Sequence, residues 1–344
     1  MNEGEVRLVH TSDWHLGAPI GWGPDKQTAQ DWISMVRRDR EAAIDSVIHV
    51  ACANKVDAVL VAGDILDQPD LSAAIKKRYE EFLRDRVVAP LAKQGIRLCL
   101  TPGTHDWLPK RKESASSLAL LRALASNLPE NILLLEPTGI PGRRVSTAEI
   151  KGLRIATEPP PKSWQGRWIE FLHDCDASRG GQPIYRAYGD RHMLTVDSTH
   201  RAHYPGSPFV RSSASDNGHT DVGPRHVLVL TIDSSGDVPK VRRECLPVKQ
   251  VAVLKQAPGT DFEWSLFYER DYEKNKWKTT DPLEGSVSTV VDQVRRSCQD
   301  VEYVTLIVPD EDLEVQRHAM TLGRSLGRSI VGSRPGIISV SLNH

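Results

Sequence analysis

The sequence predicts an α/β fold followed by a second, smaller α+β domain. Short apolar runs alternate with longer segments of helical period through the first half of the chain, which is typical of strands and helices in layers. After about residue 248 the pattern starts again in a shorter form, so we expect domains at 1–248 and 249–344. A chain of 344 residues is long enough to form two hydrophobic cores. Its 39% hydrophobic and 26% charged residues are typical of a soluble globular protein.

The first part of the chain carries the clearest elements. Buried strands are expected at 6–13, 56–64 and 96–103, and helices at 27–54 and 71–95. Strands joined by helices of this length are most simply parallel neighbours. Ligands of such sheets bind at the carboxyl ends of the strands.

The middle of the chain predicts a second sheet. The segments 131–137 and 144–157 are expected to form hairpin strands. Trp164, Trp168 and either Phe171 or Leu172 then share one face of an expected short amphipathic helix. Four apolar runs between residues 184 and 248, the last two beginning at Val227 and Val241, predict a sheet packed on the first.

The last 95 or so residues predict the small module. Strands are expected at 250–256, 303–309 and 336–342, and helices at 288–300 and 310–326. The polar segment 263–281 is expected to be an exposed linker or loop.

The composition indicates the cellular location of the protein and limits how it can bind nucleic acid. The first residues lack the basic and apolar stretches of a signal peptide, and no segment reaches the ~18 apolar residues of a membrane span, so a cytoplasmic protein without membrane contact is expected. Five cysteines, with no CxxC pair, predict reduced thiols rather than disulfides or a zinc site. A net charge of -1 means that nucleic-acid binding must depend on local patches.

Metal-binding residue types gather at the ends of the expected strands. The clusters are Asp13 with His15, Asp64 behind Gly63, His105 with Asp106, and Asp190 with His192 behind Gly189. Where a chain stays extended, side chains two residues apart point to the same face, so two of these clusters are chelating pairs. A single Asp at a strand end is more often a turn former or a helix cap, but four clusters together favour a metal site.

These segments, in the order "SDWHLG", "AGDILD", "PGTHD", "YGDRH" and "YPGS", resemble the motif series of the calcineurin-like metallophosphoesterases. They are most similar to the SbcD-type nucleases that repair DNA double-strand breaks beside a coiled-coil ATPase. The resemblance covers about residues 5–235. It implies a four-layer α/β/β/α sandwich with a smaller C-terminal α+β capping domain, DNA as substrate, an SbcC-like ATPase partner, and a homodimer.

The resemblance also implies roles for individual residues. Asp13, His15 and His192 would hold one metal ion, and Asp64 would bridge to a second. His105 would protonate the leaving oxygen or stabilise negative charge on the phosphoryl group. Asp67 would orient His105. Oxygen and imidazole ligands without thiolate suit Mn²⁺, with Mg²⁺ or Fe²⁺ as alternatives.

The sequence departs from the family pattern at the second metal. Thr104 stands where the family has Asn, and Asp190 where it has His. The family has one further His in a strand before the fourth cluster, and the corresponding interval holds only His173, inside an expected helix. Whether His173 is a ligand stays open. Asp190 is a competent hard ligand, and Thr104 could bind through its hydroxyl or a water. Two interpretations stay open, an altered two-metal site and a weakened site with one metal.

A basic run directly follows the third cluster. Lys110, Arg111 and Lys112 would flank the metal site and could contact a phosphate backbone. We therefore expect a metal-dependent DNA phosphodiesterase, the nuclease subunit of an SbcCD-like repair or defence complex. The alternatives are a small-molecule phosphodiesterase of the same fold and a catalytically weakened DNA-binding scaffold.

Overall fold

A computed structural model describes most of the first predicted domain and the strands of the second. The described residues are 5–18, 26–67, 72–107, 117–137, 140, 142, 146–160, 166–174, 182–197, 201–209, 225–233, 238–247, 250–256, 263–271, 276–279, 283–284, 289, 293, 301–308 and 336–342. The chain forms two compact units, one within Met1–Ala18, Glu41–Phe209 and Arg225–Leu246, the other within Pro19–Arg40, Val210–Pro224 and Pro247–His344. The boundary at residue 248 stays a prediction.

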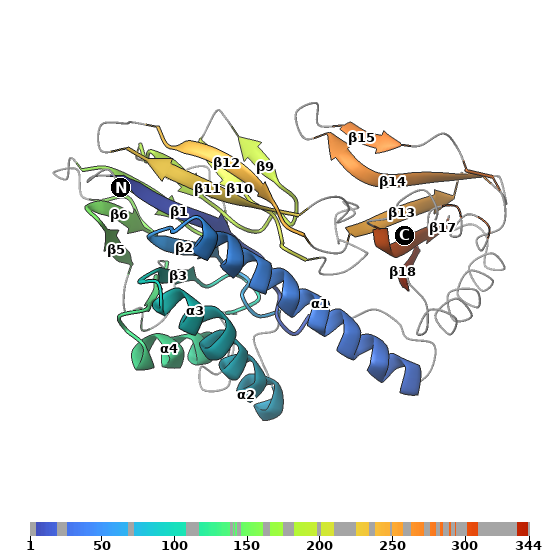
Figure 1. Cartoon of the computed structure of the whole chain (residues 1–344), viewed down its shortest axis with the longest axis horizontal. Coiled ribbons are helices and arrows are strands. Elements are labelled where there is room, and N and C mark those ends of the chain that lie inside the picture. The colour runs from blue at the N-terminus through green and yellow to red at the C-terminus, as the bar shows by residue number, and fades with distance from the viewer. Residues whose placement is uncertain are drawn as a thin grey trace. The chain divides into compact units, whose positions relative to one another are not determined.

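The first sheet has six strands in the order β12-β11-β1-β2-β3-β4. Figure 1 labels all of these strands except β4. Their bounds are β1 Val6–Thr11, β2 Ala58–Ala62, β3 Arg97–Thr101, β4 Ile132–Leu134, β11 His226–Ile232 and β12 Lys240–Cys245. Strands β1 to β4 are parallel neighbours, as predicted, so their carboxyl ends lie at one edge of the sheet. Strand β11 is antiparallel to both β1 and β12.

The predicted helices between these strands are confirmed. They are α1 (Lys26–Ala53) and a continuous helical segment formed by α2 (Ala73–Phe82), a π-helical turn (Leu83–Val88) and α3 (Ala89–Ala92). A further helix, α4 (Ser117–Asn127), lies between β3 and β4 in the sequence. Figure 1 shows these helices beside the strands of the first sheet. Among the described helices, none is long and apolar enough to cross a membrane.

The second sheet has the order β5-β6-β7-β8-β10-β9. Its strands are β5 Thr147–Ile150, β6 Leu153–Ala156, β7 Trp168–Phe171, β8 Tyr185–Ala187, β9 Thr195–Asp197 and β10 Ala202–Tyr204. The hairpin expected within 144–157 is present as β5 and β6, which are antiparallel. The expectation of hairpin material at 131–137 is wrong, because β4 there pairs in parallel with β3 in the first sheet.

Two expectations for this region are wrong. The runs at 227–233 and 241–248 do not join the second sheet, because β11 pairs along β1 and extends the first sheet. The short amphipathic helix is instead strand β7, all four residues of which are buried between β6 and β8. Its polar member, Glu170, is buried with Arg186 and Tyr188 as hydrogen-bond partners, and burial of both faces explains why no two-residue alternation marks this strand in the sequence.

The two sheets of the first unit contact each other through a polar cluster in their shared core. His10 of β1 lies fully buried with Nδ1 3.0 Å from the hydroxyl of Tyr185 in β8. The Tyr185 ring stacks on His203 of β10, with ring centroids 4.5 Å apart. The faces of β1 and β8 therefore pack together, just before the ends of these strands that carry the metal-binding residue types.

The second unit contains a third sheet, in the order β15-β14-β13-β17-β18, with β16 paired to β14. Its strands are β13 Gln250–Gln256, β14 Glu263–Asp271, β15 Lys276–Thr279, β16 Leu283–Glu284, β17 Val301–Val308 and β18 Gly336–Leu342. The three predicted strands are confirmed. The linker expected at 263–281 is wrong, because β14 and β15 form an antiparallel pair there. Of the two expected helices, 310–326 and all of 288–300 except residues 289 and 293 lie outside the described residues.

Candidate metal centre

The loops that follow β1, β2 and β3 run side by side at the carboxyl edge of the first sheet. The backbone N–H of Asp13 donates to the carbonyl of Gly63 at 3.0 Å, and the backbone N–H of His15 donates to the carbonyl of Asp64 at 2.9 Å. From the third loop, the N–H of His105 donates to Asp64 Oδ1 at 2.8 Å. A Cβ at Gly103 would lie 2.2 Å from that same carboxylate oxygen, so only glycine allows this approach.

Four of the predicted ligand positions have left-handed backbone. The φ angles are 54° at Asp13, 45° at His15, 49° at Asp64 and 66° at Asp190. Extended chain at the Asp13–His15 pair was therefore the wrong basis for expecting its side chains on one face. Each such non-glycine conformation costs on the order of 1–3 kcal/mol and persists only where neighbouring structure holds it. Backbone hydrogen bonds between adjacent loops supply that restraint here.

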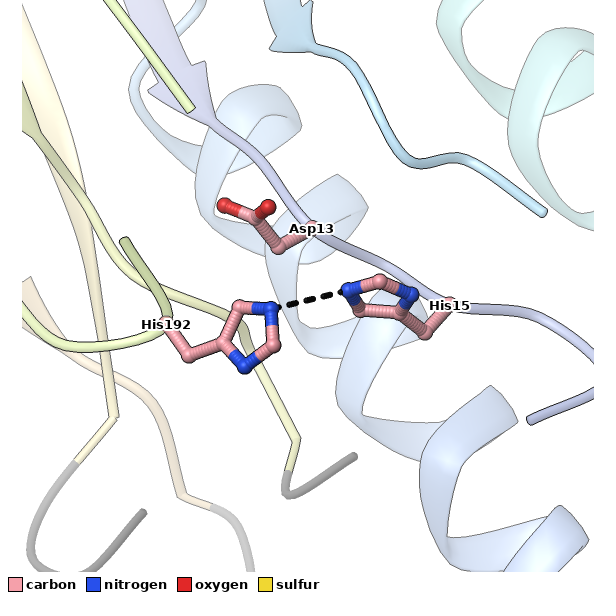
Figure 2. A group of neighbouring side chains, drawn as sticks. All are labelled: Asp13, His15 and His192. Atoms are coloured by element: carbon pink, nitrogen blue, oxygen red, sulfur yellow. Dashed lines mark hydrogen bonds between the residues drawn. The ribbon is translucent and has the colours of Figure 1, made fainter. Parts of the chain in front are cut away.

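Asp13, His15 and His192 form the first group of ligating atoms, all within 4.8 Å of one another. The Nε2 atoms of the two histidines face each other at 3.1 Å (Figure 2). Asp13 and His15 come from the loop after β1, whereas His192 comes from the loop after β8. The second sheet thus contributes a ligating side chain to a site built mainly on the first.

Asp13, Asp64 and His173 form a second group on the same distance criterion, and all three are buried. His173 Nε2 lies 3.2 Å from Asp64 Oδ2, and His173 Nδ1 lies 2.9 Å from the carbonyl of Ala62. The expectation of a helix around His173 was wrong, because this residue comes shortly after the buried strand β7. Its ring contacts the carbonyl of Ala62, the last residue of β2. The structure therefore brings a histidine next to Asp64, where the sequence had left a possible ligand in doubt.

His15, Asp64 and His105 form a third group. Asp64 lies at the meeting point of all these side chains. Its Oδ2 is 3.2 Å from His173 Nε2, 3.7 Å from His15 Nε2 and 4.0 Å from His105 Nε2. A carboxylate in this position can contact ions on either side of it.

Asp67 contacts two of the histidines through different atoms. Its backbone carbonyl lies 2.7 Å from His105 Nδ1, and its carboxylate Oδ1 lies 3.0 Å from His15 Nδ1. Asp67 was expected to orient His105 through the carboxylate. It does contact His105, but through its backbone carbonyl. Its carboxylate instead faces His15, because the loop after β1 that carries His15 is hydrogen-bonded along the loop that carries Asp67.

The two substituted positions lie at the margin of the site. Asp190 has an exposed carboxylate whose Oδ1 is 4.0 Å from His173 Nε2, and it belongs to none of the three groups. Thr104 is exposed in the turn between Gly103 and His105. The basic residues Lys110, Arg111 and Lys112 lie outside the described residues. Ligation by Asp190 or Thr104 stays a prediction.

Asp106 has a structural role next to the centre. This fully buried carboxylate accepts backbone N–H groups from Gly103 at 2.9 Å, Ile65 at 3.1 Å and Leu66 at 2.8 Å. It thereby ties the loop after β3 to the loop after β2. Burial raises the pKa of Asp106 to about 7, with further help from the charge of Asp64, while these backbone donors oppose the rise.

The "YPGS" segment holds the backbone of the first group. Ser207 Oγ donates to the carbonyl of Asp13 at 2.6 Å. The carbonyl of His192 accepts both the N–H of Ser207 at 3.0 Å and the Nη1 of Arg225 at 3.2 Å. Ser207 and Arg225 are both buried, so these bonds are shielded from water. Sequence patterns alone had not indicated this supporting role for either residue.

Burial and mutual charge determine protonation in the centre without metal. Burial raises the pKa of Asp13 to about 6, although the charges of His173 and His192 oppose this. For Asp64 burial also favours the acid form, but contact with His173 and the charges of three histidines lower its pKa below the usual range. Burial lowers the pKa of His173, yet contact with Asp64 and the charge of Asp13 outweigh it and raise the value to about 10.

The side chains fit divalent cations. Asp13 and Asp64 are buried side by side, a costly arrangement unless positive charge is supplied. His173 Nε2 is also buried and, despite its 3.2 Å approach to Asp64, makes no contact of hydrogen-bond geometry with any described residue. Two nitrogen ligands of one ion lie about 3 Å apart when each is about 2.1 Å from the ion at roughly a right angle, and the His15 and His192 Nε2 atoms are 3.1 Å apart.

Comparison with known proteins identifies related sequences. A family model described as Calcineurin-like phosphoesterase matches residues 6–220. The SbcD subunit of the nuclease SbcCD from Escherichia coli strain K12 is 31% identical over 142 residues, which is 40% of this chain and 31% of that protein. The corresponding SbcCD subunit from Rhodobacter capsulatus is 30% identical over 120 residues, covering 35% and 25%. "DNA double-strand break repair protein Mre11" of Aeropyrum pernix is 31% identical over 113 residues, covering 33% and 24%.

These alignments with individual relatives are partial. The chain spans between about a quarter and a third of the length of the curated relatives it matches. The family model, in contrast, spans the whole segment from β1 to beyond the "YPGS" loop. It therefore includes every side chain of the three ligating groups.

Proposed function

The chain belongs to the calcineurin-like phosphoesterase family, and from that premise we propose that it is a metal-dependent nuclease that hydrolyses phosphodiester bonds of DNA. One observation carries the proposal. Buried carboxylates and imidazoles from both sheets converge in groups that share Asp13 and Asp64. Shared carboxylates between two groups of ligands are what a pair of adjacent ions requires.

In this proposal the centre binds two ions. Asp13, His15 and His192 would hold the first, Asp64 and His173 would hold the second, Asp64 would be shared between them, and Asp190 and Thr104 would be further ligands of the second. The position of His173 supports two ions over one, because a buried imidazole at the end of β7 supplies the ligand that the sequence had left in doubt. The alternative of a decayed, inactive scaffold accordingly loses its main support.

The bound ions would polarise the phosphoryl oxygens and activate the attacking water. His105 is placed to act on the leaving oxygen. Its Nδ1 faces the carbonyl of Asp67, which only accepts hydrogen bonds, so Nδ1 carries a proton and Nε2 is the atom that exchanges protons with a substrate. The side chain is 28% exposed, compared with 1% for His15, so substrate can reach it.

Asp67 supports the same reaction from behind. Its carboxylate, 3.0 Å from His15 Nδ1, favours the tautomer that leaves His15 Nε2 as a metal ligand. Its carbonyl fixes the ring of His105 at the same time. One residue thus orients both a ligand of the first ion and the proposed acid.

The substrate, ion and partner are proposed from the relatives. Their names describe a nuclease subunit and a double-strand-break repair protein, which supports DNA as the substrate. A donor set of carboxylate and imidazole without thiolate supports Mn²⁺, with Mg²⁺ or Fe²⁺ as alternatives. An SbcC-like ATPase partner, a homodimer, a cytoplasmic location and DNA contacts by Lys110, Arg111 and Lys112 belong to the same proposal.

Metal content and cleavage test this function together. Purified protein is dialysed against Mn²⁺, its manganese per chain is measured, and cleavage of linear and single-stranded DNA is followed. We expect two ions per chain and Mn²⁺-stimulated cleavage, both reduced in Asp64→Asn. Asp85→Asn removes a fully exposed carboxylate of the π-helical turn and serves as the matched control.

The outcomes separate the alternatives. Less than one ion per chain, with no cleavage above the level of Asp64→Asn, would refute a metal-dependent enzyme. Cleavage of bis-p-nitrophenyl phosphate or nucleotides without cleavage of DNA would instead assign a small-molecule substrate to the same centre.

A further inference from the structure

Arg191 lies between two residues of the metal centre in the loop after β8. Asp190 precedes it and His192 follows it, so its Cα is about 3.8 Å from each neighbouring Cα. The N–H of Arg191 donates to the carbonyl of Gly189 at 2.8 Å, which closes a three-residue turn around Asp190, where φ is 66°. Arg191 is exposed. The turn therefore fixes the point from which an exposed cation extends beside the centre.

A buried tyrosine holds the guanidinium group of Arg191. The Cζ atom lies 4.4 Å from the centroid of the Tyr204 ring. Tyr204 is 2% exposed and packs in a core cluster with Leu172, Tyr188 and Ala202, so it is a rigid platform. A guanidinium that is stacked by its face keeps its in-plane N–H donors available for a ligand.

Arg191 differs from other arginines of the described residues in its partner. Arg122 and Arg186 are bound to buried carboxylates, Glu136 and Glu170 respectively. For Arg191, in contrast, no carboxylate of the described residues lies within ion-pair distance, and the aromatic ring of Tyr204 is its contact. A planar cation held in this way suits bidentate binding of phosphate oxygens.

We propose that Arg191 binds the phosphate next to the scissile one in a DNA chain, a role that rests on the nuclease function proposed above. The centre takes the scissile phosphodiester, and the arginine belongs to the turn that carries His192, directly before that residue. A neighbouring phosphate is present in every oligonucleotide but absent from an isolated phosphodiester. The contact supplies affinity and positions the strand without selecting a base sequence.

The test compares two substrates in Mn²⁺, a single-stranded DNA oligonucleotide and bis-p-nitrophenyl phosphate, across a range of salt concentrations. For Arg191→Ala we expect about a tenfold rise in KM for DNA, at least fivefold greater than any change for the small ester. The slope of log kcat/KM for DNA against log salt should become shallower by about 0.7, the value for one lost contact to a single strand. Arg191→Lys should keep the slope while raising KM by less.

Arg97→Ala is the matched control. Arg97 is an exposed arginine at the start of β3, whereas the centre lies beyond the carboxyl ends of β1, β2 and β3. This variant should retain the wild-type KM and salt slope. Manganese content is measured in every variant, because a loss of bound ions in Arg191→Ala would mean that it acts through the metal ligands and would overturn the proposal.

Two failures are distinguishable. If the wild-type protein cleaves DNA but Arg191→Ala matches Arg97→Ala in both KM and slope, the role of Arg191 is wrong and the nuclease function stands. If the wild-type protein cleaves the small ester but no DNA, both proposals are wrong.

Discussion

Replacement of His173 is the sharpest test of the two-ion centre. Without metal this imidazole carries a proton, because its pKa is raised to about 10, and it neutralises Asp64 at 3.2 Å. His173→Asn removes the ligand atom Nε2 and this charge but keeps a polar side chain of smaller size. Loss of groups that merely support a metal ligand typically weakens metal binding about 10- to 100-fold. Loss of the ligand itself should reach at least the upper value, about 3 kcal/mol.

The assay counts ions and distinguishes the two sites. Equilibrium dialysis with elemental analysis should give two manganese ions per chain in the wild-type protein and one in His173→Asn at an ion concentration that just saturates the wild type. His192→Asn should also bind one ion, but at the other site, so the double variant should bind none. His49→Asn, which changes an exposed histidine of α1, should bind two.

Protein stability provides a second measurement. In the metal-free protein, His173→Asn leaves Asp13 and Asp64 buried without their nearest cation. Breaking such a buried pair costs about 3–5 kcal/mol, and protonation of Asp13, whose pKa is already about 6, limits the loss. Two ions bound to His173→Asn with wild-type affinity would refute the assignment of His173 as a ligand.

Three further predictions concern residues around the centre. His105→Gln should lower kcat for DNA at least about 100-fold, because general acid catalysis contributes about 10²–10⁴-fold, while leaving manganese content unchanged. Ser207→Ala should weaken the first ion about tenfold in a manganese titration, because Asp13 loses the 2.6 Å hydrogen bond to its carbonyl. His10 has its pKa lowered to about 3 by burial and then by the charge of His203, whereas the unfolded chain binds a proton near pH 6.5. Through this residue, the free energy of unfolding of the metal-free protein should therefore fall by about 2 kcal/mol between pH 7 and pH 5. The decrease should be smaller in His10→Gln. Urea denaturation at the two pH values measures this difference.

Each of these has an opposite result that contradicts it. Unchanged kcat in His105→Gln would exclude His105 as the acid. Wild-type manganese affinity in Ser207→Ala, and the same affinity in Ser207→Thr, would show that the hydrogen bond to Asp13 does not position this ligand. An identical pH dependence in wild type and His10→Gln would mean that His10 is not the group whose protonation favours unfolding.

Much of the centre was predictable because its residues follow strands that the sequence marks clearly. Asp13, Asp64 and His105 each come after a short apolar run, and parallel strands bring such ends to one edge regardless of the details of packing. The residue types then indicate a hard divalent cation. The match of residues 6–220 to the family model agrees with this prediction.

The position of His173 could not be decided in this way. Strand β7 is only four residues long, contains the buried Glu170, and has aromatic residues at a spacing that also suits a helix. What stabilises it as a strand is pairing with β6 and β8 and the ion pair of Glu170 with Arg186, and these partners lie elsewhere in the sequence. Propensity over four residues is too weak to compete with such contacts.

The sequence by itself determined the α/β class, the parallel order of the first strands and the chemistry of the ligands, because these depend on local periodicity and residue type. Only the tertiary structure decided that β11 pairs with β1, that the carboxylate of Asp67 faces His15, and that His173 reaches Asp64. Side-chain period along a strand is local, whereas the neighbour that a strand or a carboxylate meets depends on long-range pairing and burial. The number of ions that this centre can hold is therefore a property of the folded sheets, and the sequence pattern left it open.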